Sequence, residues 1–158
     1  MIKIVNANLM EAKESIIGHQ VNCKGVMGSG VALQVKTKFP EAFIAYKTLV
    51  DRVKDSPFDT STLLLGGSQI VKCKNGKYIA NLFGQDSYGT DRKNTSEEKL
   101  FEALTELYEF AKESNLTVAL PWKLGCCRGG GNWEEVYGFL KELFKDDADL
   151  VIYKLDLN

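Results

Sequence analysis

The sequence predicts an α/β fold in which one mixed β-sheet is covered by helices on both faces. Segments with the apolar pattern of strands alternate along the chain with segments whose apolar residues recur at helical spacing. One Asn-Gly pair, Asn75-Gly76, separates two strand-like segments and predicts a type I′ hairpin. The hairpin adds an antiparallel pair to a sheet that its helical crossovers make parallel. The sheet is therefore expected to be mixed.

Six segments are expected to form the strands of this sheet. They are Ile2–Asn6, Ser15–Val21, Leu63–Cys73, Tyr78–Phe83, Thr117–Leu120 and Leu150–Leu155. The segment Thr117–Leu120 is short and mostly apolar, which is typical of a strand buried on both faces.

Four longer segments are expected to be helical: Gly30–Phe39, Glu41–Val53, Thr95–Ser114 and Trp133–Phe144. Pro40 separates the first two, because proline interrupts a helix. Thr95 and Glu98 have the spacing of a capping box, which places a helix start at Thr95. Asn132 and Glu135 repeat this spacing before the last helix.

Two glycine-rich loops each join a strand to a helix. The first loop spans residues 22–30 and contains three glycines; the second spans residues 121–132 and contains four. Backbone N–H groups at a helix start lack helical partners and lie at the positive end of the helix dipole, so they favour an anion such as phosphate. Ligands of open α/β sheets bind beyond the carboxyl ends of the strands, where such loops meet. The pair of loops predicts a ligand with two phosphates, or with a phosphate and sugars; a plain glycine-rich turn is the alternative for either loop alone.

The glycine spacing excludes two common nucleotide-binding motifs. The first loop reads G-x-x-G-x-G, whereas the Rossmann fingerprint reads G-x-G-x-x-G. The P-loop motif G-x-x-x-x-G-K-[ST] does not occur in the sequence. The ligand is therefore expected in a fold of another kind.

Composition restricts the partners and the compartment. The net charge of −1 argues against nucleic acid as a bulk partner. No apolar run approaches eighteen residues and the start does not resemble a signal peptide, so we expect no membrane contact and a cytoplasmic location. The cysteines, Cys23, Cys73, Cys126 and Cys127, lack metal-ligand spacing and are expected to be free thiols. We expect no metal and no cofactor.

Three segments resemble the macro domain family: His19–Ala32, Ile79–Gln85 and Gly125–Trp133. The order of elements matches too, so the resemblance covers residues 1–158 as a single macro domain. The chain is most similar to short macro domains of the ADP-ribose 1″-phosphate phosphatase and terminal ADP-ribose protein glycohydrolase kind. The resemblance implies a three-layer α/β/α sandwich, with a mixed and mostly six-stranded sheet, that binds ADP-ribose or a derivative.

The resemblance also implies roles for individual residues. Asn8 would read the adenine, Tyr153 would flank it, and Asn22 would contact the distal ribose. The first loop would line the ribose and the pyrophosphate, and the second would cradle the phosphates. The expected ligand-binding residues are Asn8, Asn22, Gly28, Ser29, Gly30, Val31, Gly125, Cys126, Arg128, Gly129, Gly130, Gly131, Asn132 and Tyr153.

Two departures from the family pattern concern catalysis. Glycohydrolases of this branch use a lysine nucleophile just after the hairpin strand, where this chain has Gln85, and their assisting aspartate falls at Gly129-Gly130. Neither glutamine nor glycine can form a Schiff base or act as a general base, so the lysine mechanism is not expected.

Few candidates for catalysis remain. Asn22 and the single histidine, His19, are the candidate catalytic residues, with a structural role as the alternative for His19. Asp86 and Asp91 follow Gln85 and fit solvated loop carboxylates better than a water-activating pair. Two functions stay open. One is hydrolysis of a 1″-phosphate, an acetyl ester or an ADP-ribosyl adduct at the distal ribose, and the other is a module that binds ADP-ribose without turnover.

Overall fold

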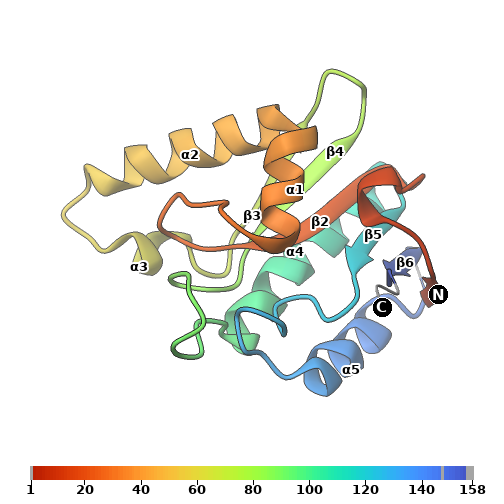
Figure 1. The fold of residues 1–158 in the computed structure, drawn as a ribbon. Coiled ribbons are helices and arrows are strands. Elements are labelled where there is room, and N and C mark those ends of the chain that lie inside the picture. Colours follow the sequence, from red (N-terminus) through yellow and green to blue (C-terminus); the bar gives the residue numbers. More distant parts are fainter. Residues whose placement is uncertain (1, 147, 156–158) are drawn as a thin grey trace.

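The computed structural model describes residues 2–146 and 148–155. In chain order the elements are β1 (Ile2–Val5), the 3₁₀ helix η1 (Leu9–Glu11), β2 (Ile16–Val21), α1 (Gly30–Lys38), α2 (Pro40–Lys54), α3 (Thr60–Leu64), β3 (Ser68–Lys72), β4 (Tyr78–Phe83), α4 (Glu97–Ser114), β5 (Val118–Pro121), α5 (Trp133–Leu143) and β6 (Leu150–Tyr153). Figure 1 shows their arrangement. Among these residues, no helix is both long and apolar enough to cross a membrane.

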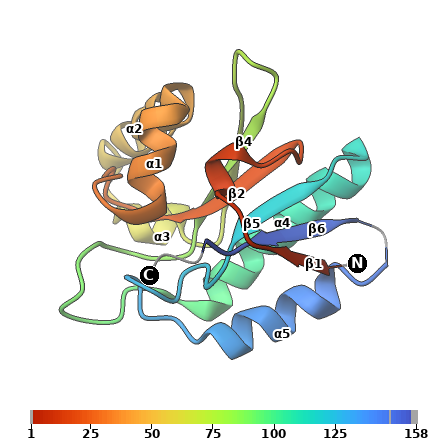
Figure 2. The same ribbon diagram turned by 45° about the vertical axis from the view of Figure 1, so that its right-hand side comes forward.

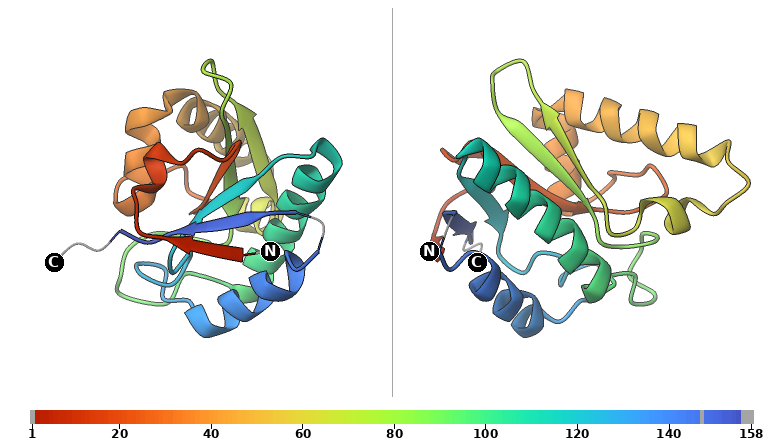
Figure 3. Two further views of the ribbon diagram at one scale, coloured as in Figure 1. Left: turned by 90° about the vertical axis from the view of Figure 1, so that its right-hand side faces the viewer. Right: turned by 180° about the vertical axis from the view of Figure 1, so that it is seen from behind.

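The six strands form one mixed sheet in the order β1-β6-β5-β2-β4-β3. Only β3 runs antiparallel to its neighbour, β4. Helices α1, α2 and α3 lie on one face, and α4 and α5 lie on the other, as Figure 2 shows. The right-hand view of Figure 3 shows α4 and α5 side by side on their face. The predicted α/β/α sandwich with a mixed six-stranded sheet is confirmed.

Strand β2 occupies the centre of the sheet and sends alternate side chains to the two layers. Ile16 packs into the apolar cluster beneath α4 and α5, whereas Ile17 and Val21 pack toward α1, α2 and α3. Gly18 lies on the α4 face, where a Cβ atom would come within 2.6 Å of Leu120 Cδ2. The strand therefore lies buried against both helical layers, and its carboxyl end opens into the first glycine loop.

The hairpin between β3 and β4 differs from the predicted type I′ turn. A type I′ turn requires positive φ at both central residues. Here Gly76 has φ +88°, while Asn75 is not among the non-glycine residues with positive φ. The amide of Gly76 donates to Cys73 O (2.9 Å) and the amide of Cys73 donates to Lys77 O (2.8 Å). The connection is thus a three-residue loop whose last residue is a left-handed glycine.

Two element boundaries also differ from expectation. Leu63 and Leu64 belong to the short helix α3 rather than to a strand, and the strand begins only at Ser68. Helix α4 is capped by Ser96, whose side chain accepts from the amide of Lys99, and not by Thr95. The hydroxyl of Thr95 instead forms hydrogen bonds with Gln20 and Gly125 beneath the second glycine loop.

Candidate functional site

A cavity of about 500 Å³ opens beyond the carboxyl ends of β2, β4 and β5. One wall comes from the end of β2, the first glycine loop and the start of α1. The other comes from residues 85, 88 and 89 after β4 and from residues 121–125 and 127–129 of the second loop. The volume lies within the range of small-molecule sites, roughly 300–1,000 Å³. The two glycine loops, which are distant in sequence, therefore share one cavity, as the strand order requires.

Asn22 orders the first loop through both ends of its amide. Its Oδ1 accepts from the amide of Lys24 (2.9 Å) and lies 2.7 Å from the Tyr46 hydroxyl. Its Nδ2 donates to Val26 O (2.7 Å), and the residue is only 5% exposed. Asn22 lines the cavity, but its amide is occupied with holding the loop, and an amide cannot activate water.

The start of α1 forms the anion-binding end of the cavity. Gly28, Ser29, Gly30 and Val31 all line the cavity. The N-cap residue Ser29 makes no side-chain hydrogen bond to the helix, and the first turn carries no acidic residue. No side chain among the described residues consequently caps the first N–H groups of α1, which lie at the positive end of a helix dipole.

The start of α5 is closed to anions by its own residues. The Asn132 side chain accepts from the amide of Glu135 (3.2 Å), and its backbone N–H donates to Glu97 Oε2 (2.9 Å). Glu134 and Glu135 add negative charge to the first turn. Of the two helix starts that follow the glycine loops, only that of α1 is therefore suited to phosphate.

Of the second-loop residues that were predicted to bind the ligand, some line the cavity and others lie within the loop. Gly125, Arg128 and Gly129 line the cavity, whereas Cys126, Gly130, Gly131 and Asn132 lie outside its lining. The amide of Gly131 donates to Gly125 O (3.0 Å), so this N–H folds the loop back on itself. The Cys126 thiol lies 3.1 Å from Leu124 O, and burial raises its pKa to about 11. Cys127 lines the cavity in its place.

A polar network beneath the second loop was not predicted from the sequence. Gln20 Nε2 donates to Gln85 Oε1 (2.7 Å) and to Thr95 Oγ1 (2.8 Å), and Thr95 Oγ1 donates to Gly125 O (2.8 Å). A Cβ atom on Gly129 would overlap Thr95 Oγ1, so this position requires glycine. The signal available in the sequence was Gln20, a polar residue within a mostly apolar strand. The network ties β2 to both loops that follow β4 and β5.

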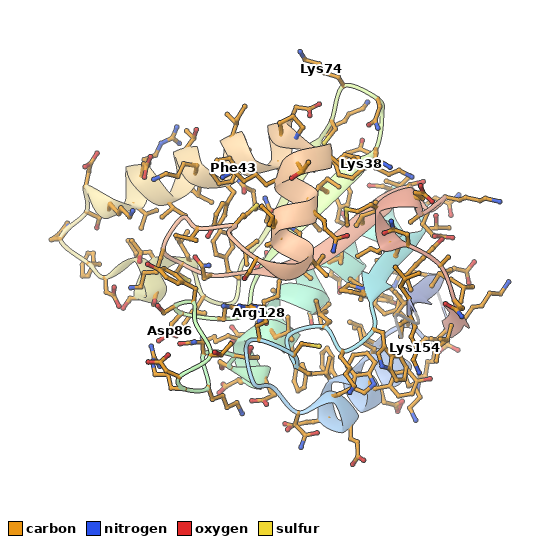
Figure 4. All side chains as sticks on the ribbon, in the orientation of Figure 1. Lys38, Phe43, Lys74, Asp86, Arg128 and Lys154 are labelled. Atoms are coloured by element: carbon orange, nitrogen blue, oxygen red, sulfur yellow. The ribbon has the colours of Figure 1, made fainter. Side chains whose placement is uncertain are left out.

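The charge of the cavity is positive, although the chain has a net charge of −1. Lys123 and Arg128 line the cavity, and of the residues described there, none is an aspartate or a glutamate. Neither cation forms an ion pair within residues 2–146 and 148–155. The Cδ atom of Arg128 lies 3.5 Å from the position of a Cβ on Gly30, and Figure 4 shows Arg128 below the lower end of α1. Arg128 therefore extends from the second loop to the first.

His19 contributes a neutral ring to the cavity. The side chain is 1% exposed, and its Nε2 lies 2.7 Å from Asn81 Oδ1. Burial lowers the pKa of His19 to about 4, so the imidazole is uncharged near pH 7. Asp86 forms an ion pair with Arg92 (3.3 Å), and neither Asp86 nor Asp91 lines the cavity.

The two residues predicted to hold adenine lie outside the cavity lining. Asn8 Oδ1 accepts from the amide of Met10 (3.0 Å) and caps η1. The Tyr153 hydroxyl lies 2.6 Å from Glu14 Oε1. Two aromatic residues that the sequence did not single out, Tyr88 and Trp122, do line the cavity. The adenine roles of Asn8 and Tyr153 stay predictions.

Two curated proteins illustrate what this chain is similar to. The DNA ADP-ribosyl glycohydrolase of Mycobacterium tuberculosis is 33% identical over 159 residues, which cover 97% of this chain and 42% of that protein. The chain thus spans less than half the length of this relative. The ADP-ribose 1″-phosphate phosphatase of Meyerozyma guilliermondii is 28% identical, with 81% of this chain and 83% of that protein covered.

A solved structure and a family model define the family. The macrodomain of Mycobacterium tuberculosis DarG is 31% identical, covers 97% of each chain and has a TM-score of 0.81. The family model of the macro domain matches residues 19–139, a segment that holds both glycine loops. The chain therefore belongs to the macro domain family.

Proposed function

We propose that this chain binds ADP-ribose in the cavity and hydrolyses a derivative of it at the distal ribose. The proposal depends above all on the charge of the cavity. Lys123 and Arg128, which pair with no carboxylate among the described residues, and the uncapped start of α1 face a space whose described lining holds no carboxylate. Such a site favours the two charges of a pyrophosphate. The relatives named for acting on ADP-ribose derivatives support the same ligand.

The pyrophosphate is assigned to Gly28–Val31 on one side and to Gly125, Arg128 and Gly129 on the other. Asn22 is assigned to the distal ribose, and Asn8 and Tyr153 to the adenine. Gly131 and Asn132 are assigned to shaping the second loop, because the Gly131 amide and the Asn132 amide and side chain are engaged within the protein. Gly130 joins them because it lies outside the cavity lining. This assignment narrows the set of residues expected to contact the ligand.

Among the candidate derivatives, the site favours a phosphate ester. Gln85 offers no nucleophile for the covalent route of the lysine glycohydrolases. Hydrolysis of a 1″-phosphate needs no protein nucleophile: water attacks phosphorus, the bond from phosphorus to the ribose oxygen breaks, and that oxygen leaves with a proton. Lys123, the cation of the lining that is not assigned to the pyrophosphate, would neutralise the charge that the 1″-phosphate carries. ADP-ribose 1″-phosphate is therefore the proposed substrate.

A second function, binding without turnover, is favoured by one observation. No carboxylate lines the described cavity, and its only imidazole has a pKa of about 4. The site thus lacks an evident general base near pH 7. A binding module would keep every contact proposed for ADP-ribose and lose only the hydrolysis.

One paired measurement tests both functions. Calorimetry with ADP-ribose should give a micromolar Kd, roughly −7 to −9 kcal/mol, and AMP should bind far more weakly. Phosphate release from ADP-ribose 1″-phosphate should occur with the same protein. Binding without release would select the module, and no heat at millimolar ADP-ribose would overturn both functions.

A further inference from the structure

A chain of hydrogen bonds, partly buried at β3 and fully buried at β4 and β2, crosses these three strands beneath α2. Gln69 Nε2 donates to Ala45 O (3.0 Å), which leaves Gln69 Oε1 to accept from Asn81 Nδ2 (3.1 Å). Asn81 Nδ2 also donates to Ala42 O (3.2 Å). Because both partners of Nδ2 are acceptors, the orientation of the Asn81 amide is determined. Its Oδ1 must point toward His19.

This orientation determines the tautomer of His19. Asn81 Oδ1 can only accept, so the proton of the neutral imidazole lies on Nε2, 2.7 Å away. The other ring nitrogen, Nδ1, is then a bare acceptor. It is buried and has no hydrogen-bond partner within the described residues. Buried acceptors without a partner are rare and costly, which points to a donor that arrives with a ligand.

His19 lines the ligand cavity, only a few residues before the first glycine loop. We infer that His19 Nδ1 accepts a hydrogen bond from a ribose hydroxyl of the bound nucleotide. The inference rests on the proposed function. The pyrophosphate assigned to the start of α1 carries no donor, but it is flanked on both sides by ribose hydroxyls. His19 is thus assigned to sugar recognition and not to proton transfer.

Nitrogen NMR of the imidazole tests this inference directly, because the chain contains a single histidine. In the free protein, ¹⁵N spectra should show a protonated Nε2 and an unprotonated Nδ1. Saturating ADP-ribose should move the Nδ1 resonance upfield, as a nitrogen moves when it accepts a hydrogen bond. Backbone amide shifts of Gly28–Val31 in the same sample report whether the ligand has bound.

Three further ligands identify the donor. Inorganic pyrophosphate should shift the loop amides and leave Nδ1 unchanged. A shift with ADP as well as ADP-ribose would assign the donor to the adenosine ribose, and a shift with ADP-ribose alone would assign it to the distal ribose. If ADP shifts Nδ1, 2′,3′-dideoxy-ADP should not. Bound ADP-ribose with an unmoved Nδ1 overturns the inference but leaves the proposed function intact; no binding overturns the proposed function.

The variant His19→Gln distinguishes the roles of the two ring nitrogens in binding. The glutamine amide can still donate to Asn81 Oδ1, but it places no acceptor where Nδ1 lies. The variant should fold, with the thermal midpoint as the check, and ADP-ribose affinity should fall roughly three- to tenfold. Inorganic pyrophosphate should bind the variant and the parent equally. Unchanged ADP-ribose affinity in a folded His19→Gln protein would contradict the inference.

Discussion

The Tyr46 hydroxyl on α2 lies 2.7 Å from Asn22 Oδ1 and 2.8 Å from Asn22 O. The same oxygen accepts from the amide of Gly25 at 3.1 Å. Tyr46 is fully buried, and burial raises the pKa of its phenol, so the hydroxyl stays protonated and able to donate. One side chain on α2 thus holds both ends of the turn that begins the first glycine loop.

Removing this hydroxyl should loosen the loop. We expect Tyr46→Phe to lower the free energy of unfolding by about 1–3 kcal/mol, because two buried partners lose a hydrogen bond. ADP-ribose affinity should fall as well, since the loop no longer holds its shape. Denaturant unfolding and calorimetry measure the two effects. Tyr78→Phe is the matched control, and an equal loss of stability in both variants would show that the Tyr46 hydroxyl has no special role.

Gln85 and Asn22 should differ in their importance for turnover. Gln85→Ala should reduce hydrolysis of ADP-ribose 1″-phosphate less than tenfold, about 1.4 kcal/mol in the barrier, because the amide offers no nucleophile. Asn22→Ala should cost more, since Asn22 is assigned to the distal ribose and its amide also shapes the first loop. Phosphate release over time measures both. Turnover that requires Gln85 and survives the loss of Asn22 would reverse the proposed orientation of the ligand.

The sequence predicted the features that depend on local pattern. Helix α5 and its cap at Asn132 follow from spacing alone, and both glycine loops were recognised from composition and position. The hairpin type was wrong, because an Asn-Gly pair suits either a two-residue turn or the end of a three-residue loop. Strand register decides between them, with Lys72 opposite Tyr78.

The parts of the site that depend on tertiary contacts could not be predicted. Thr95 was expected to cap a helix, but it bonds to Gln20 and Gly125, which are distant in sequence. The pairing of His19 with Asn81 needs the register of β2 and β4. Neither contact leaves a periodic signal in the chain, because each joins single residues from separate elements.

Arg128 should make an electrostatic contribution to binding. We expect Arg128→Gln to weaken ADP-ribose binding and to reduce its dependence on salt, because the substitution removes a cation that no carboxylate in the described part of the chain neutralises. Titrations at two salt concentrations measure this. Arg92→Gln is the control, since Arg92 pairs with Asp86 and lies outside the cavity lining. Identical salt dependence in parent and Arg128→Gln would exclude a contact with the phosphates.

Neighbouring glycines of the second loop should respond differently to alanine. A methyl group on Gly129 would overlap Thr95 Oγ1, so Gly129→Ala should disrupt the polar network and weaken ADP-ribose binding strongly. Gly130 lies outside the cavity lining, and Gly130→Ala should act mainly through its φ of +79°, a strain of about 1 kcal/mol. Calorimetry and thermal unfolding on both variants decide this. A larger loss of affinity for Gly130→Ala would place the phosphates further along the loop.

His19 should make the stability of the fold depend on pH between 6.5 and 4. Burial lowers the pKa of His19 from 6.5 to about 4 in the folded protein. Below pH 6.5, His19 binds a proton in the unfolded chain but not in the folded protein. The stabilisation present above pH 6.5 is therefore lost as the pH falls toward 4. The full loss is about 3 kcal/mol, since one pKa unit is worth about 1.4 kcal/mol.

Carboxylates titrate in the same window, so the measurement compares unfolding free energies of the parent and His19→Gln at pH 7.5 and pH 4.5. The variant should lose distinctly less stability over this interval, because its amide does not titrate. Equal losses in the two proteins would mean that His19 takes up a proton in the folded protein as readily as in the unfolded chain, and that burial does not lower its pKa.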